Sequence, residues 1–246
     1  MKRVVLLGSC LAALLAGCGE DDKGKAGNPL AEDQTQQEGP PATTQTQPAE
    51  PPAEEEPAAE VEVAESGFSE LEDTVAYGAV LKNSSQDSEV SEIEVTINAL
   101  DARGDVLTTD TKNVSVIPPG EEFVIGGDLD PGGDTVEELD IEVEAGDSGP
   151  PEHPLPKVTN VRIQEEEYGG LNVRAQVENT LDKELSSITD VFGVVRNAKG
   201  KIIAGGFTFP ENGINPGRKA SVELNFLYDL PGAESAEVSV DNEITP

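Results

Sequence analysis

The chain has 246 residues, with 49 acidic against 16 basic side chains and a formal net charge of −33 at pH 7. A surface this acidic repels phosphate backbones and anionic lipid headgroups, which excludes a nucleic-acid-binding role. Solubility and self-repulsion account for the charge; a basic partner or divalent cations are the alternatives.

Residues 1–17 have the pattern of a secretory signal. A basic start precedes an apolar run over residues 4–15, which is too short to span a bilayer as a helix. The run ends in LAGC at residues 15–18, which resembles the lipobox of bacterial lipoproteins. The resemblance implies acylation of the Cys18 thiol, with cleavage between Gly17 and Cys18. An ordinary secretory signal followed by a chance cysteine is the alternative.

The second cysteine, Cys10, lies inside the segment that this cleavage removes. The mature chain would then hold neither a free thiol nor a disulfide, so its fold must depend on core packing. Thiolate catalysis and zinc sites built from cysteine clusters are excluded for the same reason.

Residues 18–66 are expected to form a disordered, acidic and proline-rich tether. Pro, Ala, Glu, Gln and Thr dominate from Gly19 to Ser66, and large apolar side chains are almost absent. Such a composition cannot bury enough apolar surface to offset chain entropy. Proline and like charges extend a chain of this kind, to at most ~160 Å at about 3.3 Å per residue. We interpret the segment as a passive spacer.

The remaining chain repeats one pattern on either side of the Pro/Gly-rich segment 149–156. In each half an asparagine is followed 21 residues later by a turn glycine and then by a Pro-Gly pair. These positions are Asn83, Gly104 and Gly120 in the first half and Asn179, Gly200 and Gly217 in the second. At an offset of 96, Val75, Tyr77, Ala79 and Leu81 match Leu171, Val173, Ala175 and Val177. We infer a tandem duplication.

Apolar residues alternate with polar ones in both halves, which is the signature of half-buried strands. Examples are Ile93-Val95-Ile97, Leu139-Ile141-Val143 and Val222-Leu224-Phe226. Turn residues separate these runs. We therefore expect an all-β fold with two antiparallel β-sandwiches, over 67–148 and 157–246, joined by a linker over 149–156.

The order of these strands and turns resembles the FxLYD-type immunoglobulin-like domains of prokaryotic secreted lipoproteins. The matching positions are Ile97-Asn98-Ala99-Leu100-Asp101 before Gly104, and Gly193-Val194-Val195-Arg196-Asn197 before Gly200. The resemblance implies immunoglobulin-like sandwich modules at the cell surface, and it implies no catalytic residues.

The segment DLDPGGD is the best candidate for a metal site. Asp128, Asp130 and Asp134 could offer three carboxylates to calcium from a flexible loop. In an EF-hand starting at Asp128, however, Leu139 stands where a bidentate glutamate is needed. A solvated loop between strands is the interpretation we favour, and we expect no cofactor.

Other polar clusters have simpler interpretations. Consecutive strand residues point to opposite faces, so residues 165–167 (EEE) do not pair across a substrate. His153, the only histidine, lies in the proline-rich joint and is interpreted as a linker residue. Asn83 and Asn113 each begin a glycosylation sequon, which we attribute to chance. For Phe207, Phe209, Phe226 and Tyr228 we expect core packing, with an exposed binding face as the alternative.

These observations predict a lipid-anchored protein on the extracytoplasmic face of a membrane, periplasmic or at the cell surface. We expect it to be non-enzymatic, and to bind a protein or an envelope polymer or to serve a structural role. A ligand-capturing lipoprotein that serves a transporter or sensor is the alternative from another class. It needs a concave pocket, most plausibly between the sandwiches. A hydrolase is the least favoured interpretation.

Overall fold

The computed structural model describes residues 61–71, 73–166 and 169–242. The expected signal peptide, Gly17, Cys18 and the tether up to residue 60 lie outside this range. Within these residues, no helix has the length and apolarity needed to cross a membrane.

The described residues form thirteen strands in four antiparallel sheets, which confirms the all-β prediction and the two sandwiches. The first sandwich pairs the sheet β1-β2-β5 with the sheet β4-β3-β6, and the short β7 also pairs with β3. Its strands are β1 (Val61–Leu71), β2 (Thr74–Asn83), β3 (Glu89–Leu100), β4 (Val106–Ile117), β5 (Glu122–Leu129), β6 (Glu138–Glu144) and β7 (Ser148–Gly149).

The second sandwich pairs the sheet β12-β9-β8 with the sheet β11-β10-β13. Its strands are β8 (Lys157–Glu165), β9 (Leu171–Glu178), β10 (Val191–Asn197), β11 (Ile202–Thr208), β12 (Lys219–Phe226) and β13 (Ala233–Val240).

The first sandwich extends beyond both expected boundaries. Residues 61–66, which the composition assigned to the tether, are the first part of β1 and pair with β2. Val61 and Val63 alternate with Glu62 and pack against the first core, so the alternation outweighs the acidic composition. At the other end, β7 includes Gly149 of the expected linker.

Each sandwich has its own apolar core at the positions that the repeat predicted. Alternate residues of β2 point into the first core and the matching residues of β9 point into the second. All are buried: Val75, Tyr77, Ala79 and Leu81 in β2, and Leu171, Val173, Ala175 and Val177 in β9.

The asparagine of the repeat has the same structural role in both copies. Asn83 and Asn179 are fully buried. The Nδ2 of Asn83 donates to the carbonyls of Ser88 (2.8 Å) and Ile117 (3.0 Å). The Nδ2 of Asn179 donates to those of Lys183 (2.7 Å) and Ile214 (2.6 Å). In each copy Oδ1 accepts from the backbone N–H two residues on. Each asparagine therefore ties the end of a core strand to two other segments of its sandwich.

The turn after the third strand of the repeat is also the same in both copies. The Oδ1 of Asp101 accepts the backbone N–H groups two and four residues further on, and the Oδ1 of Asn197 does the same. Gly104 and Gly200 have φ of 80° and 79°, in the left-handed region that glycine adopts without strain. The offset of 96 residues thus relates equivalent turns.

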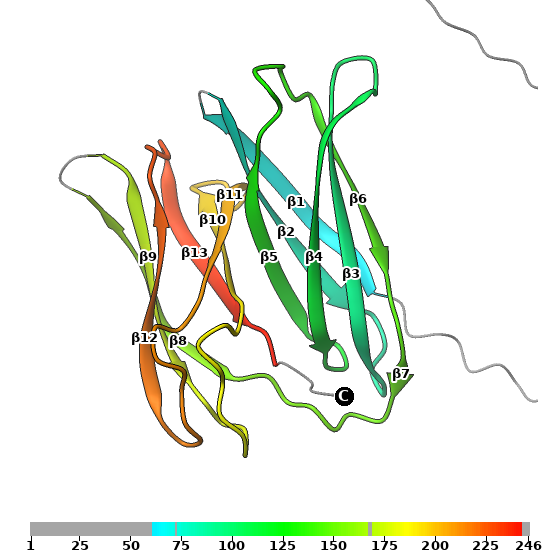
Figure 1. The fold of residues 1–246 in the computed structure, drawn as a ribbon, viewed down its shortest axis with the longest axis vertical. Helices are drawn as coiled ribbons and strands as arrows, with labels where there is room; N and C mark the ends of the chain where they lie inside the picture. The colour runs from blue at the N-terminus through cyan, green and yellow to red at the C-terminus, as the bar shows by residue number, and fades with distance from the viewer. Residues whose placement is uncertain (1–60, 72, 167–168, 243–246) are drawn as a thin grey trace, which may run out of the picture. The chain divides into compact units, whose positions relative to one another are not determined.

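The two sandwiches pack against each other face to face. The outer face of the sheet β1-β2-β5 contacts the sheet β11-β10-β13 (Figure 1). Gly126 of β5 meets the backbone of β11 so closely that a Cβ atom on it would lie 2.5 Å from the amide nitrogen of Gly206. Glycine is required there because two backbones are in direct contact.

Apolar and polar side chains complete this interface. Val80 and Val124 of the first sandwich form a buried cluster with Val194 and Ile202 of the second. Asp241 accepts hydrogen bonds from the backbone N–H (2.9 Å) and the Oγ (2.7 Å) of Ser115. Backbone atoms and apolar side chains therefore fill the centre of the interface between the two sandwiches.

Candidate functional site

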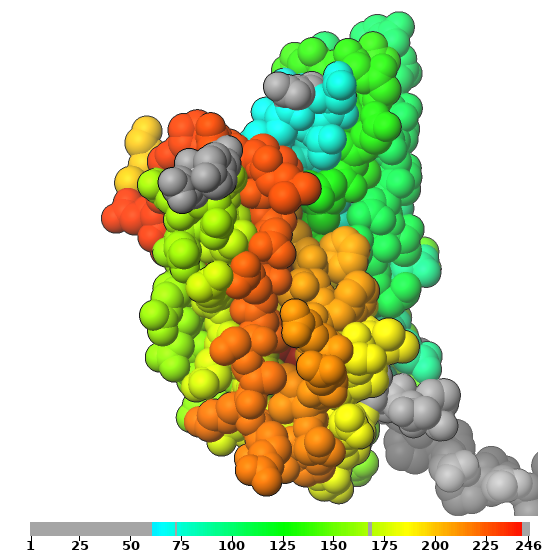
Figure 2. Space-filling view, turned by 60° about the vertical axis from the view of Figure 1, so that its left-hand side comes forward, coloured from blue at the N-terminus to red at the C-terminus, as the bar shows by residue number. Residues whose placement is uncertain are grey.

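The outer face of the sheet β12-β9-β8 is lined with hydrogen-bonding side chains. Because Val173 and Ala175 of β9 face the core, Arg174 and Gln176 face outward. The register places outward residues of the neighbouring strands beside them. We call this surface the polar face and define it by Arg162, Gln164, Arg174, Gln176, Glu223 and Asn225. Figure 2 shows β8 and β9 in yellow-green beside β12 in orange, on the side turned forward.

A hollow of about 590 Å³ lies over the polar face. Beyond the sheet it is bounded by Thr208, Phe209 and Glu211, which come from the end of β11 and the connection to β12. This volume is within the range of small-ligand sites in proteins. We take this hollow as the candidate binding site because its lining is rich in hydrogen-bonding side chains.

Two arginines stand opposite each other across the sheet. Arg162 of β8 is in register with Arg174 of β9, which is in register with Glu223 of β12. The Nε of Arg174 lies 2.6 Å from Oε2 of Glu223. Like charges directly opposite each other destabilise a sheet, and this glutamate offsets one of the two. Arg162 is exposed and has no ion pair with any residue that the structure describes.

A β-bulge changes the direction of β8 just before Arg162. The register between β8 and β9 shifts between Thr159 and Arg162. Asn160, inside the bulge, has φ of 55°, in the left-handed region that asparagine adopts more readily than most residues other than glycine. Bulges are frequent next to binding sites, because they redirect side chains. Here they set the direction of Asn160 and Arg162, which both line the hollow.

The aromatic residues divide between core and surface. Phe226 is 3% exposed and packs in the second core, so core packing is confirmed there. Phe207 and Phe209 are each 45% exposed, so the expectation of core packing was wrong for them. The two rings contact each other, with centroids 5.7 Å apart in an edge-to-face arrangement. Lys112 of the first sandwich lies over the Phe207 ring, 4.5 Å from its centroid.

The acidic segment DLDPGGD, residues 128–134, has structural roles. Asp128 accepts a hydrogen bond of 2.8 Å from the hydroxyl of Tyr228, across the interface between the sandwiches. Burial and this carboxylate raise the pKa of Tyr228 well above its ordinary value, so the hydroxyl stays a donor. Asp130 caps the turn by accepting from the backbone N–H of Gly132 (2.9 Å). The backbone N–H of Asp134 closes the same turn. Among the described residues, no group of three His, Cys, Asp or Glu is placed to hold a metal.

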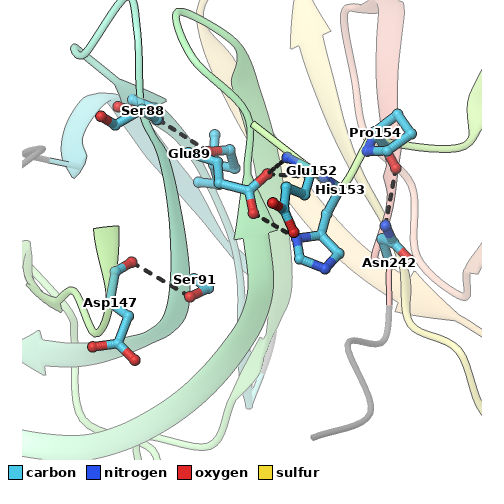
Figure 3. Close-up of polar contacts among 10 residues, drawn as sticks. Ser88, Glu89, Ser91, Asp147, Glu152, His153, Pro154 and Asn242 are labelled. Atoms are coloured by element: carbon cyan, nitrogen blue, oxygen red, sulfur yellow. Dashed lines mark hydrogen bonds and ion pairs between the residues drawn. The ribbon is translucent and has the colours of Figure 1, made fainter. Parts of the chain in front are cut away.

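His153 holds the connection between the sandwiches against a buried carboxylate (Figure 3). Glu89 is 6% exposed, and its Oε2 accepts the backbone N–H groups of Glu152 and His153, both at 2.9 Å. The Nδ1 of His153 lies 2.5 Å from Oε1 of Glu89. Burial acts to raise the pKa of Glu89, but these three hydrogen bonds outweigh it and lower the pKa. On the far side, Asn242 donates to the carbonyl of Pro154 (2.9 Å). The linker is therefore tied to the first sandwich through Glu89 and to the second through Asn242.

The remaining polar clusters lie apart from the polar face or at its edge. Of the glutamates at 165–167, the structure describes the first two; Glu166 accepts from Nδ2 of Asn172 (2.6 Å) at the end of the β8–β9 hairpin. Asn83, at the first sequon, is buried and fully hydrogen-bonded, whereas Asn113 is exposed on β4. A glycan on Asn83 would not fit the folded chain.

The sequence reading missed the polar face, although the signal was available. The apolar residues of β9 were used to locate the core, and the alternation that buries them also turns Arg174 and Gln176 outward. What the sequence does not contain is the register that aligns Arg162 with Arg174, because a bulge sets it.

No protein-family model matches the chain, and no curated protein sequence matches it. A solved structure of red sea bream transglutaminase is similar over 74% of this chain and 29% of that chain, with 14% sequence identity and a TM-score of 0.26. The chain thus spans less than a third of that protein. The similarity is distant, and nothing about the activity of this chain follows from it.

Proposed function

We propose that this chain is a lipid-anchored protein on the extracytoplasmic face of a membrane, and that it acts as a non-enzymatic binding or structural module of the cell envelope. The LAGC motif at residues 15–18 supports the anchor at Cys18. The acidic, proline-rich composition of residues 18–60 supports a spacer between the anchor and the sandwiches. The strand order and turns of both sandwiches support an immunoglobulin-like, FxLYD-type module.

The single observation that carries the binding role is the hollow over the polar face. Its side chains project from a rigid sheet, offer both donors and acceptors, and include an exposed aromatic ring at Phe209. Fixed groups of this kind bind with little loss of side-chain entropy. A ligand-capturing role needs a concave pocket, most plausibly between the sandwiches. Hollows lined by residues of both sandwiches lie beside Tyr228 and beside Val238, but the direct backbone contact at Gly126 fills the centre of the interface, so we favour the surface-binding role.

The anchor is tested by replacing Cys18 with serine in the full chain and following its partition between membrane and soluble fractions. We expect the wild type in the membrane fraction and Cys18→Ser in the soluble fraction or retained as an uncleaved precursor. Cys10→Ser is the matched control, because Cys10 lies in the segment to be removed. Mature Cys18→Ser protein that still fractionates with the membrane would contradict the proposal.

The binding role is tested by crosslinking on intact cells, followed by identification of what co-purifies. We expect crosslinks from the second sandwich to an envelope component. Crosslinks confined to copies of the same chain would contradict a binding role toward other envelope components.

A further inference from the structure

The side chains of the polar face suit one class of ligand, and the inference drawn from them rests on the binding role proposed above. We propose that the polar face, together with Phe209 at its rim, binds an uncharged glycan strand.

The first argument is the mixture of donors and acceptors. Arg162 and Arg174 only donate, Glu223 only accepts, and the amides of Gln164, Gln176 and Asn225 do both. A sugar hydroxyl also donates and accepts, so it can satisfy every one of these groups. A phosphate or carboxylate only accepts, and it would leave Glu223 and the amide oxygens facing a like partial charge.

The second argument is the balance of charge. Two arginines and two glutamates, Arg162, Arg174, Glu211 and Glu223, line the hollow, so its charges cancel. The rest of the chain therefore carries the whole net charge of −33. A polyanion approaching the hollow would be repelled by this field, whereas an uncharged polymer is not affected by it.

The third argument is the aromatic ring. Phe209 is 45% exposed, and its contact with Phe207 fixes it at the rim. A fixed ring presents a flat apolar surface to the C–H face of a pyranose at low entropic cost. The buried centre of a protein–protein interface is apolar and depleted of charge. Among the described residues that line this hollow, Phe209 is the one exposed large apolar side chain, so a glycan fits better than a protein.

The fourth argument is the form of the site. The hollow is open and extends over three strands, from Asn160 in β8 to Asn225 in β12. Adjacent strands are about 4.8 Å apart, so polar side chains recur at regular intervals across the sheet. An open, regularly spaced row of hydrogen-bonding groups suits an extended polymer rather than a compact small molecule.

The proposal is tested by titrating the full chain with four hexasaccharides of defined charge. The chain is kept in a polyoxyethylene detergent, which has no sugar headgroup. Cellohexaose, xylohexaose and N-acetylchitohexaose are the uncharged probes, and hexagalacturonate is the anionic one. Binding is measured by calorimetry. We expect at least one uncharged probe to bind and hexagalacturonate to bind at least about tenfold more weakly.

Matched variants assign the binding to this face. Phe209→Ala is expected to weaken binding by about tenfold, the usual effect of truncating an aromatic anchor. Arg162→Gln is expected to weaken it about three- to tenfold through a lost hydrogen bond. Leu227→Ala, at an apolar residue that is 90% exposed, and Arg103→Gln, in an exposed turn of the first sandwich, are the controls and should leave affinity unchanged.

Three results would overturn the proposal: no uncharged probe binds, hexagalacturonate binds as tightly as the best of them, or the variants weaken binding no more than the controls. Thermal unfolding of each variant checks that it folds, and Arg162→Gln decides alone if Phe209→Ala does not. The titration is carried out in solution and does not depend on the anchor. A negative titration would therefore not contradict anchoring at Cys18, and a negative anchoring test would not affect the titration.

Discussion

Replacing either buried asparagine of the repeat with alanine should destabilise the whole folded unit, and by a similar amount. Asn83 and Asn179 each donate both N–H groups of Nδ2 to backbone carbonyls and accept one backbone N–H at Oδ1; in Asn83 the two N–H groups serve three carbonyls, because Pro118 also lies 3.2 Å from Nδ2. At about 1 kcal/mol for each bond, Asn83→Ala and Asn179→Ala should each cost about 3 kcal/mol. Domains are stable by about 5–15 kcal/mol, so this is a large fraction of the total.

The packing of the sandwiches against each other adds a second expectation. At Gly126 the backbones of the two sandwiches are in direct contact. Both sandwiches should therefore unfold in one transition, and each variant should shift that whole transition. For a chain of this size, 3 kcal/mol corresponds to a fall in the melting temperature of about 6–12 °C.

Calorimetry and urea unfolding measure both effects. Asn113→Ala, at an exposed asparagine of β4, is the matched control and should change stability by less than about 0.5 kcal/mol. A loss below about 1 kcal/mol for either buried asparagine would refute the hydrogen-bond argument. Two separate transitions, of which only one moves, would refute cooperative packing.

Two further predictions concern the linker and the interface. The folded state lowers the pKa of Glu89, so its ionised form stabilises the fold above its ordinary value of 4.5, and this contribution is lost as pH falls through the folded pKa. Urea unfolding of wild type and Glu89→Gln should therefore differ most above pH 4.5 and converge at lower pH; a difference that stays constant from pH 7 to 3 would contradict this. At the interface, Gly126→Ala places a Cβ atom 2.5 Å from the amide nitrogen of Gly206 and should cost at least about 1–3 kcal/mol by calorimetry. Gly149→Ala, where a Cβ meets nothing within 4 Å, should change stability little, and equal effects of the two variants would disprove the close approach.

Much of the fold could be predicted from alternation and turn chemistry. The strand positions, the two cores and the offset of 96 residues follow from local rules, because a half-buried strand needs an apolar residue at every second position. The first boundary was misplaced for a local reason as well. Glu62 and Glu65 make 61–66 look like the tether, while Val61 and Val63 already mark a strand.

The candidate site could not be predicted to the same extent. Alternation in β9 indicates that Arg174 and Gln176 face solvent, but not which residues stand beside them. The bulge around Asn160 brings Arg162 into register with Arg174, and the connection after β11 places Phe209 at the rim. The positions of Arg162 and Phe209 therefore depend on backbone conformations in β8 and after β11, which lie apart from β9 in the sequence.

By itself, the sequence determined the all-β class, the duplicated unit and the acidic surface, and it predicts the anchor at Cys18. Each of these depends on composition or short-range spacing. Only the tertiary structure decided that the sandwiches pack through Gly126, that Glu89 holds the linker at His153, and that a polar hollow lies on the second sandwich. The physical reason is that these contacts join residues tens of positions apart, and close approach and register are set by the packed backbone as a whole.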